Sequence, residues 1–450
     1  MNVTVENLAA CRRLVKVEVD APAVEAAYVK ITDEFQKNVK LPGFRPGKAP
    51  RDMIVKNYSK AIDDEVKKRL INEHYEKALK EQKLHAVTAP DIEEIQFSRG
   101  QPLQFAATIE IAPEFELPVY KGVKVKRETG DVTDEDIERA FTALREQRAK
   151  FNDVDRAAAA GDVVVVAYEG TSDGKPLIEI APTAKGLTKQ DNFWMQIKPD
   201  SFVPGFTEQL VGAKAGDKRT VNVTFPKDFV SPALSEKPAV YQVEIKQVKE
   251  KILPELNDEF AKEFKAPSLA DLREGVRKDL QNELNYKRQM AVRNQAMKAL
   301  MDNVNFDLPE SVVTAETRSV INDIVSDSHR RGVTQENIEA QKNEIFGYAN
   351  QSARERVKGA FILGRIADKE GIRVTQEDLV ARVTQLAQQN NLTFQKMVKE
   401  LQDRGALSTV RDQVLVGKSL DFVVQHASIE DVPAGTLAAE QAAKAATPAT

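Results

Sequence analysis

Cysteine, aromatic residues and long apolar runs are the scarce features of this chain of 450 residues. Cys11 is the only cysteine, so no disulfide can form within the chain, and a reducing compartment fits its composition. No apolar stretch reaches the roughly 18 residues that a membrane-spanning helix needs, so we expect no membrane partner. The first residues, MNVTVE, have neither a basic segment nor an apolar run. We therefore expect no signal peptide and a cytoplasmic location.

The motifs of nucleotide, serine-hydrolase and metal chemistry are also absent from the sequence. There is no GxxxxGK[ST], no GxGxxG and no GxSxG, so neither ATP use nor a hydrolase of that class is indicated. The histidines are scattered, without carboxylate or cysteine companions at ligand spacing. They are His74, His85, His329 and His426. We expect no metal site and no cofactor.

What the chain does contain is charge. Charged residues make up 30% of the sequence, aromatic residues 6%, and the mean hydropathy is −0.42. This balance favours long amphipathic helices over one compact core, and the length allows about three domains. The net charge of −4 gives no overall attraction to nucleic acid. Between residues 30 and 60, however, eight basic residues outnumber three acidic ones.

That basic region surrounds a turn at residues 43–50, GFRPGKAP, between two stretches of helical period. Two glycines and two prolines within eight residues predict a tight turn. Its tip displays Phe44, Arg45 and Lys48. Cations bind phosphate and an aromatic ring stacks or wedges, so such a tip suits the surface of ribosomal RNA and protein. A plain helix–helix connection with solvated charges is the alternative.

The turn resembles the ribosome-docking signature of the trigger factor family, Gly-Phe-Arg-x-Gly-Lys-x-Pro, at all six fixed positions. The resemblance implies that Gly43, Phe44, Arg45, Gly47 and Lys48 bind the large ribosomal subunit near the exit tunnel, on protein and rRNA. Pro46 stands where many members have lysine. The family also implies nascent and unfolded polypeptides as partners, and it leaves open a homodimer of the free protein.

The N-terminal part reads as a small α+β domain. Alternation at residues 15–19 and 103–111 predicts half-buried strands, and helical period follows Pro22 and Pro50. We assign residues 1–113 to a ribosome-docking domain and residues 114–160 to a linker of one strand and one helix.

Residues 161–250 change to short strands and turns, with a hairpin at Asp173-Gly174. The motifs VPGF at 203–206 and KAGD at 214–217 resemble the FK-binding (FKBP) type of prolyl isomerase. That family binds a proline ring in an apolar pocket. By position, the resemblance implies as catalytic pocket residues Tyr168, Phe193, Phe202, Val203, Phe206 as the floor, and Tyr241. Alternatively, these side chains simply fill a barrel core.

The chemistry of such a pocket needs no nucleophile. Resonance gives the peptide bond a rotation barrier of ~18–20 kcal/mol, and an apolar pocket that removes water from the prolyl carbonyl weakens that resonance. Two departures from the family predict a weak catalyst. Leu177-Ile178 replaces a Phe-Asp pair, and the segment 179–191 is longer than usual.

After Pro254 the sequence has helical period almost to its end, without a visible repeat. Its apolar stripes are narrow, which is typical of helices that pack in pairs and leave grooves. We predict an all-α domain with helical arms at residues 251–433 that holds unfolded segments, and a disordered tail at 434–450.

The sequence thus predicts a multidomain α+β protein: an N-terminal α+β docking domain, an inserted FKBP-like domain of antiparallel sheet and helix, and a helical C-terminal domain. The leading hypothesis is an ATP-independent, ribosome-associated chaperone that also isomerises X-Pro bonds. The alternatives are a ribosome-independent prolyl isomerase and a holdase or assembly chaperone whose isomerase fold is inactive.

Overall fold

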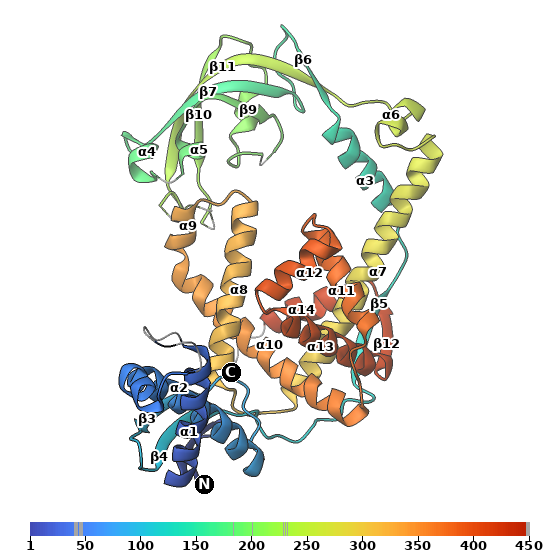
Figure 1. Cartoon of the computed structure of the whole chain (residues 1–450). Helices are drawn as coiled ribbons and strands as arrows, with labels where there is room; N and C mark the ends of the chain where they lie inside the picture. Colours follow the sequence, from blue (N-terminus) through green and yellow to red (C-terminus); the bar gives the residue numbers. More distant parts are fainter. Residues whose placement is uncertain are drawn as a thin grey trace. The chain divides into compact units, whose positions relative to one another are not determined.

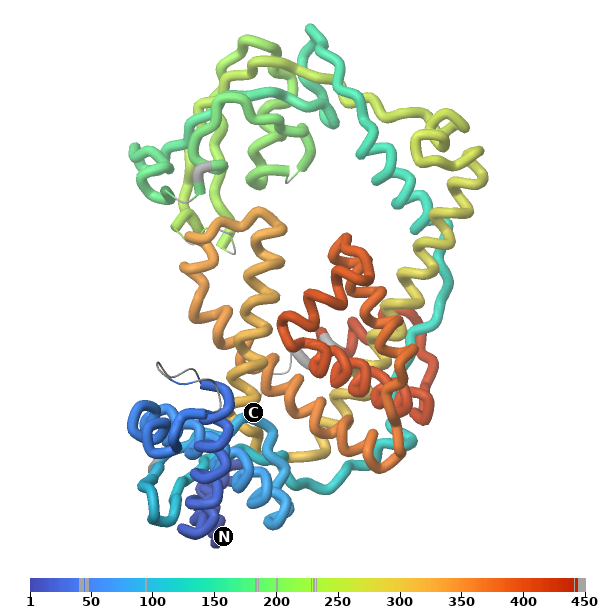
Figure 2. Tube along the Cα trace, in the orientation of Figure 1, coloured from blue at the N-terminus to red at the C-terminus, as the bar shows by residue number. Residues whose placement is uncertain are grey.

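The computed structural model describes residues 1–39, 44, 48–182, 184–199, 201–227, 229, 231 and 233–446 (Figures 1 and 2). The chain packs as two compact units. The first joins Met1–Thr129 to Arg288–Thr450, and the second is Gly130–Lys287. Together the two units contain the elements that the sequence predicts. These are a sheet with helices at the N-terminus, an antiparallel sheet domain in the middle of the chain, and helices towards the C-terminus. The predicted fold class is confirmed.

The first unit begins with an antiparallel sheet in the strand order β1-β2-β4-β3. Its strands are β1 (Asn2–Ala9), β2 (Arg12–Val19), β3 (Asp91–Gln96) and β4 (Leu103–Glu110). In β2, Val15, Val17 and Val19 are buried, whereas Lys16 is exposed. A strand with this alternation buries one face, and that face is covered by helices.

Those helices are α1 (Ala21–Asn38) and α2 (Arg51–Glu81). Proline in the first turn of α1 suits a position where the backbone N–H has no helical partner. Val24 and Ile31 of α1 pack in one core with Ile54 and Ile62 of α2 and with the valines of β2. The predicted docking turn, residues 43–50, lies between these two helices in the sequence.

The C-terminal part of the first unit is mainly helical. Its elements are the end of α7 (Leu269–Asp302), α8 (Glu310–Arg330), α9 (Gln335–Ala340), α10 (Lys342–Glu370), α11 (Gln376–Gln389), α12 (Phe394–Asp403), α13 (Leu407–Gln425), β12 (Ser428–Pro433) and α14 (Thr436–Ala446). Helices α8 and α10 pack along each other through Val320, Ala349 and Ala353. Two small alanines let the backbones approach closely, so this pair has a thin core.

This helical region also contains a pair of strands. The sequence does not predict that these two strands pair. Strand β5 (Lys124–Thr129) lies parallel to β12, more than 300 positions later. Val125 of β5 enters the core formed by Val292 of α7, Ile362 of α10 and Val423 of α13. The segment after residue 114 therefore contributes a strand to the C-terminal core.

The second unit is built on a six-stranded antiparallel sheet. Its elements are β6 (Lys150–Asp153), β7 (Val163–Ser172), β8 (Lys175–Pro176), α4 (Leu177–Ile180), α5 (Lys185–Thr188), β9 (Lys189–Gln196), the 3₁₀ helix η1 (Thr207–Leu210), β10 (Lys218–Thr224) and β11 (Pro238–Ile252). The predicted hairpin forms at Asp173 and Gly174, both with positive φ, as a two-residue turn of that kind requires. In β11, Tyr241, Val243 and Ile245 point into the core.

Helices α3 (Asp134–Gln147), α6 (Asp258–Glu263) and the start of α7 form a second, smaller core in this unit. Ile137 and Phe141 of α3 contact Phe260 and Leu272 there. A capping box between Thr133 and the N3 residue of α3 fixes where that helix begins.

One sequence prediction is wrong over most of its length. The sequence predicts a disordered tail at residues 434–450, but helix α14 forms over Thr436–Ala446, and residues 447–450 lie outside the described residues. Alanine has the highest helix propensity, and contacts to β5 hold this helix. Lys126 pairs with Glu440, and the N–H of Leu437 donates to Glu128 at 2.9 Å.

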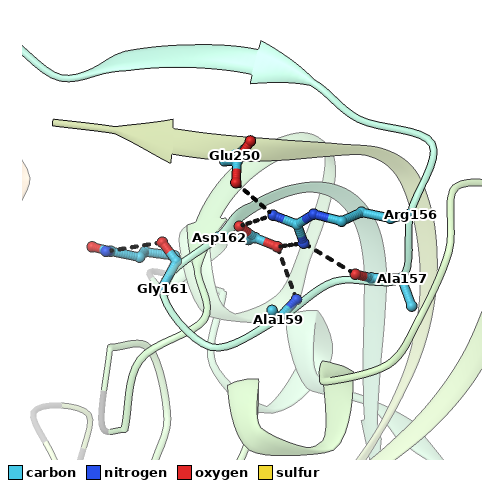
Figure 3. A network of polar contacts seen from close by, with 7 residues as sticks. Arg156, Ala157, Ala159, Gly161, Asp162 and Glu250 are labelled. Atoms are coloured by element: carbon cyan, nitrogen blue, oxygen red, sulfur yellow. Dashed lines mark hydrogen bonds and ion pairs between the residues drawn. The ribbon is translucent and has the colours of Figure 1, made fainter.

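A polar network anchors the segment that leads into β7 (Figure 3). The Asp162 carboxylate is buried and accepts two hydrogen bonds from Arg156, at 2.5 and 3.0 Å, and one from the N–H of Ala159, at 2.8 Å. Arg156 also donates to Glu250 of β11, at 3.1 Å. Burial opposes ionisation of Asp162, but the bonds from Arg156 and Ala159 outweigh it, so its pKa lies below the ordinary value.

We predict that Asp162→Asn lowers the free energy of unfolding of the second unit by about 1–3 kcal/mol at pH 7, because it leaves buried donors without an ionised acceptor. Urea unfolding followed by the fluorescence of Trp194, the only tryptophan, measures this in the full chain. Asp155→Asn, at an exposed position nearby, is the matched control.

The ion pair of Asp162 and Arg156 also makes the free energy of unfolding depend on pH, in a direction that follows from the lowered pKa of Asp162. A carboxyl whose pKa is lowered by folding stabilises the protein above its unfolded pKa and loses that contribution as the pH falls through its folded pKa. The difference between wild type and Asp162→Asn should be complete above about pH 5 and shrink below about pH 4. A difference that stays constant down to pH 3 would contradict the assigned role of the ionised carboxylate.

Candidate functional site

The docking turn is described only at part of its length. Phe44 has 38% of its surface exposed, and Lys48 is exposed too. The other predicted ribosome-binding residues, Gly43, Arg45 and Gly47, lie outside the described residues. Phe44 is not part of the core that α1 and α2 form, and more than a third of its surface is open to a partner.

The base of this turn is fixed by several contacts. Ala49 is buried, and the side-chain amide of Gln36 donates to its carbonyl at 2.6 Å. Arg51 pairs with Asp33 at 2.7 Å, which ties the start of α2 to α1. The turn is therefore presented from a helix pair whose ends are held together.

The predicted pocket residues come together in the second unit, from four places in the sequence. Tyr168 lies on β7, Phe193 on β9 and Tyr241 on β11, whereas Phe202 and Phe206 precede η1. The ring centroid of Tyr168 is 5.8 Å from Phe193, 5.3 Å from Phe202, 6.3 Å from Phe206 and 5.9 Å from Tyr241. All four pairs meet edge to face, an arrangement that aromatic quadrupoles favour.

The exposure of the side chains differs across this aromatic cluster, from fully buried to half-buried. Phe206 and Tyr241 have no exposed surface, and Val203 and Tyr168 expose 1% and 2%. Phe193 and Phe202 are half-buried against the same core. The prediction of Phe206 as a floor agrees with its burial, and Phe193 and Phe202 form the side of the cluster that reaches the surface.

Both tyrosine hydroxyls in the cluster have acceptors on α5. Tyr168 donates to the carbonyl of Gly186, and Tyr241 donates to the carbonyl of Leu187 at 2.8 Å. Burial raises the pKa of both phenols, and for Tyr241 the neighbouring Tyr168 adds to the effect. The two groups are thus neutral donors at physiological pH. Sequence reasoning missed these acceptors, although it marked the long segment that contains them.

Leu177 explains one departure of this chain from the isomerase pattern. It is fully buried, and a Cβ built on Gly170 would lie 2.5 Å from its Cδ1 atom and 2.6 Å from Cε1 of Tyr241. The missing side chain at Gly170 therefore makes room for both. Leu177 packs beside Tyr241, so the core is filled on that side without an aromatic residue.

The described part of the first unit exposes large apolar side chains on its C-terminal helices. Phe346 and Tyr348 of α10 are exposed by 56% and 67%, and Val380 of α11, Phe394 of α12 and Leu407 of α13 by 37–44%. Single exposed apolar residues are common, but these lie on consecutive helices of one region.

Among the described residues, no three His, Cys, Asp or Glu side chains gather in a group that could hold a metal ion. None of the described helices combines the length and the apolar character that crossing a membrane requires.

Comparison with known proteins covers nearly the whole chain. The family described as "Bacterial trigger factor protein (TF)" matches residues 1–144, and "Bacterial trigger factor protein (TF) C-terminus" matches residues 268–425. The trigger factor of Opitutus terrae is 35% identical over 436 residues, which cover 96% of this chain and 99% of that protein. The chain belongs to the trigger factor family. The trigger factor of Caldicellulosiruptor bescii is 31% identical and covers 95% of this chain and 97% of its own.

Residues 154–246 of this trigger factor match the family "FKBP-type peptidyl-prolyl cis-trans isomerase". The resemblances to both families are therefore confirmed, and the aromatic cluster lies inside the isomerase domain. A solved trigger factor chaperone covers 94% of this chain and 99% of its own, at 19% identity and a TM-score of 0.44. That similarity is too low to add to the assignment.

We predict that Gly170→Ala destabilises the isomerase domain by about 1–3 kcal/mol, because the added methyl group displaces Leu177 or Tyr241 from a packed core. Trp194 fluorescence during urea unfolding measures the change. Glu169→Ala, at the exposed neighbouring position, should alter stability far less, since its ion pair with Lys189 lies at the surface. Equal stability of Gly170→Ala and wild type would contradict this prediction, because it would mean that Leu177 and Tyr241 can shift without cost.

Proposed function

We propose that this trigger factor is an ATP-independent, cytoplasmic chaperone that docks on the large ribosomal subunit near the exit tunnel. It binds nascent polypeptides with its C-terminal helices and catalyses cis/trans isomerisation of X-Pro bonds in its FKBP-type domain. Family membership supports the chaperone and isomerase parts, and the absence of nucleotide motifs supports action without ATP.

The exposed Phe44, together with Lys48, is the observation that supports docking. The ring is part-exposed beside a helix pair that Gln36 and Arg51 tie together at the base of the turn. The cations around it supply contacts to phosphate.

The aromatic cluster supports isomerisation. Phe193 and Phe202 provide a half-buried apolar surface above the buried Phe206, where a proline ring can leave water. A prolyl carbonyl in that environment loses its hydrogen bonds to water, so the single-bond character of the C–N bond rises and the barrier falls. The buried phenols supply O–H donors that can orient the backbone of a bound peptide.

The exposed side chains on α10, α11, α12 and α13 support the holding of unfolded chains. Separate apolar spots on a charged surface bind extended segments weakly and without one fixed sequence. Homodimer formation and the domain boundaries at residues 113, 160, 250 and 433 stay predictions from the sequence.

The double variant Phe44→Ala/Arg45→Ala should bind ribosomes at least about tenfold more weakly at moderate salt, because it removes the ring and one phosphate contact. Co-sedimentation with purified ribosomes at two salt concentrations measures this. Phe151→Ala/Lys150→Ala removes an exposed ring and a cation from another domain and serves as the control. If the docking variant pellets like wild type, the turn is only a connection. The ribosome-independent alternatives then take precedence.

Phe202→Leu should lower kcat/KM for an X-Pro tetrapeptide roughly tenfold, since it removes a half-buried ring that contacts four others. Exchange spectroscopy of the cis and trans peptide signals gives the rate. Phe151→Leu, an exposed ring on β6, should leave the rate unchanged. An unaltered rate in Phe202→Leu would place the prolyl site elsewhere.

A further inference from the structure

The two buried phenols of the isomerase cluster donate to consecutive residues of the chain itself. Tyr168 and Tyr241 lie on neighbouring strands, and their acceptors are the carbonyls of Gly186 and Leu187. A peptide bound at this site would meet the same two O–H donors with its own carbonyls. The donors are already occupied from within the domain.

The side chain of Leu187 also contacts the aromatic cluster, as the side chain of a bound peptide would. It is half-buried and packs against the core that contains Tyr168, Phe206 and Tyr241. The sequence Gly186-Leu187 thus presents a carbonyl, an apolar side chain and a second carbonyl to the aromatic cluster. An X-Pro dipeptide has the same order of groups, with the proline ring in place of the leucine side chain.

The segment that carries these groups is one short turn, and the buried Thr188 lies at its C-terminal end. Helix α5 has four residues, and the N–H of Leu187 donates only locally, to the carbonyl of Ala184 at 2.8 Å. Gly186 is exposed, and a Cβ built on it meets no atom within 4 Å. A helical turn of four residues can open while the longer strands beneath it stay paired.

We propose that residues 184–188 are an internal pseudo-substrate that occupies the prolyl-peptide site and leaves it when a client peptide binds. This inference rests on the isomerase function proposed above and adds a regulatory element to that site. A client must displace Leu187 and take over the O–H donors of Tyr168 and Tyr241. The domain therefore favours peptides that are already held nearby at high local concentration, because a site that is only fractionally open has a lower apparent affinity for free ligand.

Leu187→Ala in the full-length protein is the first test. It keeps both carbonyls and removes the side chain that competes with the proline ring. We expect the affinity for a succinylated Ala-Phe-Pro-Phe tetrapeptide, measured by NMR titration, to rise roughly tenfold as the open fraction increases. Val240→Ala removes an apolar side chain of β11, 39% exposed, from the strand position before Tyr241 and should bind like wild type.

The outcomes separate this inference from the function on which it rests. Tighter binding by Leu187→Ala than by wild type and Val240→Ala supports the pseudo-substrate. Equal binding by all three overturns it and leaves the isomerase site intact. If the tetrapeptide binds to none of them and its cis/trans exchange is not accelerated, the proposed isomerase function fails as well.

A second measurement needs no variant and so does not depend on the folding of Leu187→Ala. Amide hydrogen exchange of wild type, with and without saturating tetrapeptide, reports whether residues 184–188 leave the site. Faster exchange at Leu187 in the bound state supports displacement. Slower or equal exchange there, while peptide is bound, overturns it.

Discussion

A buried hydroxyl must have a hydrogen-bond acceptor, and this requirement organises the isomerase domain. Tyr168 and Tyr241 supply much of the volume of the core, yet each brings a polar atom to its edge. Leaving such an atom without a partner would cost about 1–3 kcal/mol, so the chain supplies the carbonyls of Gly186 and Leu187. The same donors can serve a peptide. Both hydroxyls therefore have acceptors when no peptide is present, and the same groups can bind a peptide in the proposed function.

The first unit meets a different constraint, which is a shortage of apolar volume. Its long helices have narrow apolar faces, and the contact of α8 with α10 relies on alanines. Strands β5 and β12 strengthen the region by joining segments far apart in the sequence. Apolar side chains such as Tyr348 remain exposed beside these thin cores. Stability and the proposed capacity to hold an unfolded chain thus depend on the same sparse distribution of apolar residues.

The two proposed binding surfaces differ in kind. The proposed docking turn has a part-exposed ring, Phe44, and an exposed cation, Lys48, beside a helix pair that Arg51 and Asp33 tie together. The isomerase cluster keeps its rings largely out of water behind α5, so its apolar surface is offered to a client only when a suitable peptide competes for it. A chaperone that works without ATP has only such differences in affinity with which to direct a client from one surface to another.

The sequence by itself determined the strands of alternating valines, the helices after Pro22 and Pro50, the hairpin at Asp173-Gly174 and the six members of the cluster. These are local periods and turn residues, or motifs matched position by position. Only the tertiary structure decided which carbonyls meet the phenols, that β5 pairs with β12, and that residues 436–446 form a helix. The reason is physical: hydrogen-bond partners and strand pairs depend on which distant segments meet, and this leaves no period in the sequence. The presence of Leu177 in place of an aromatic residue was visible beforehand, but its fit against Gly170 and Tyr241 was not.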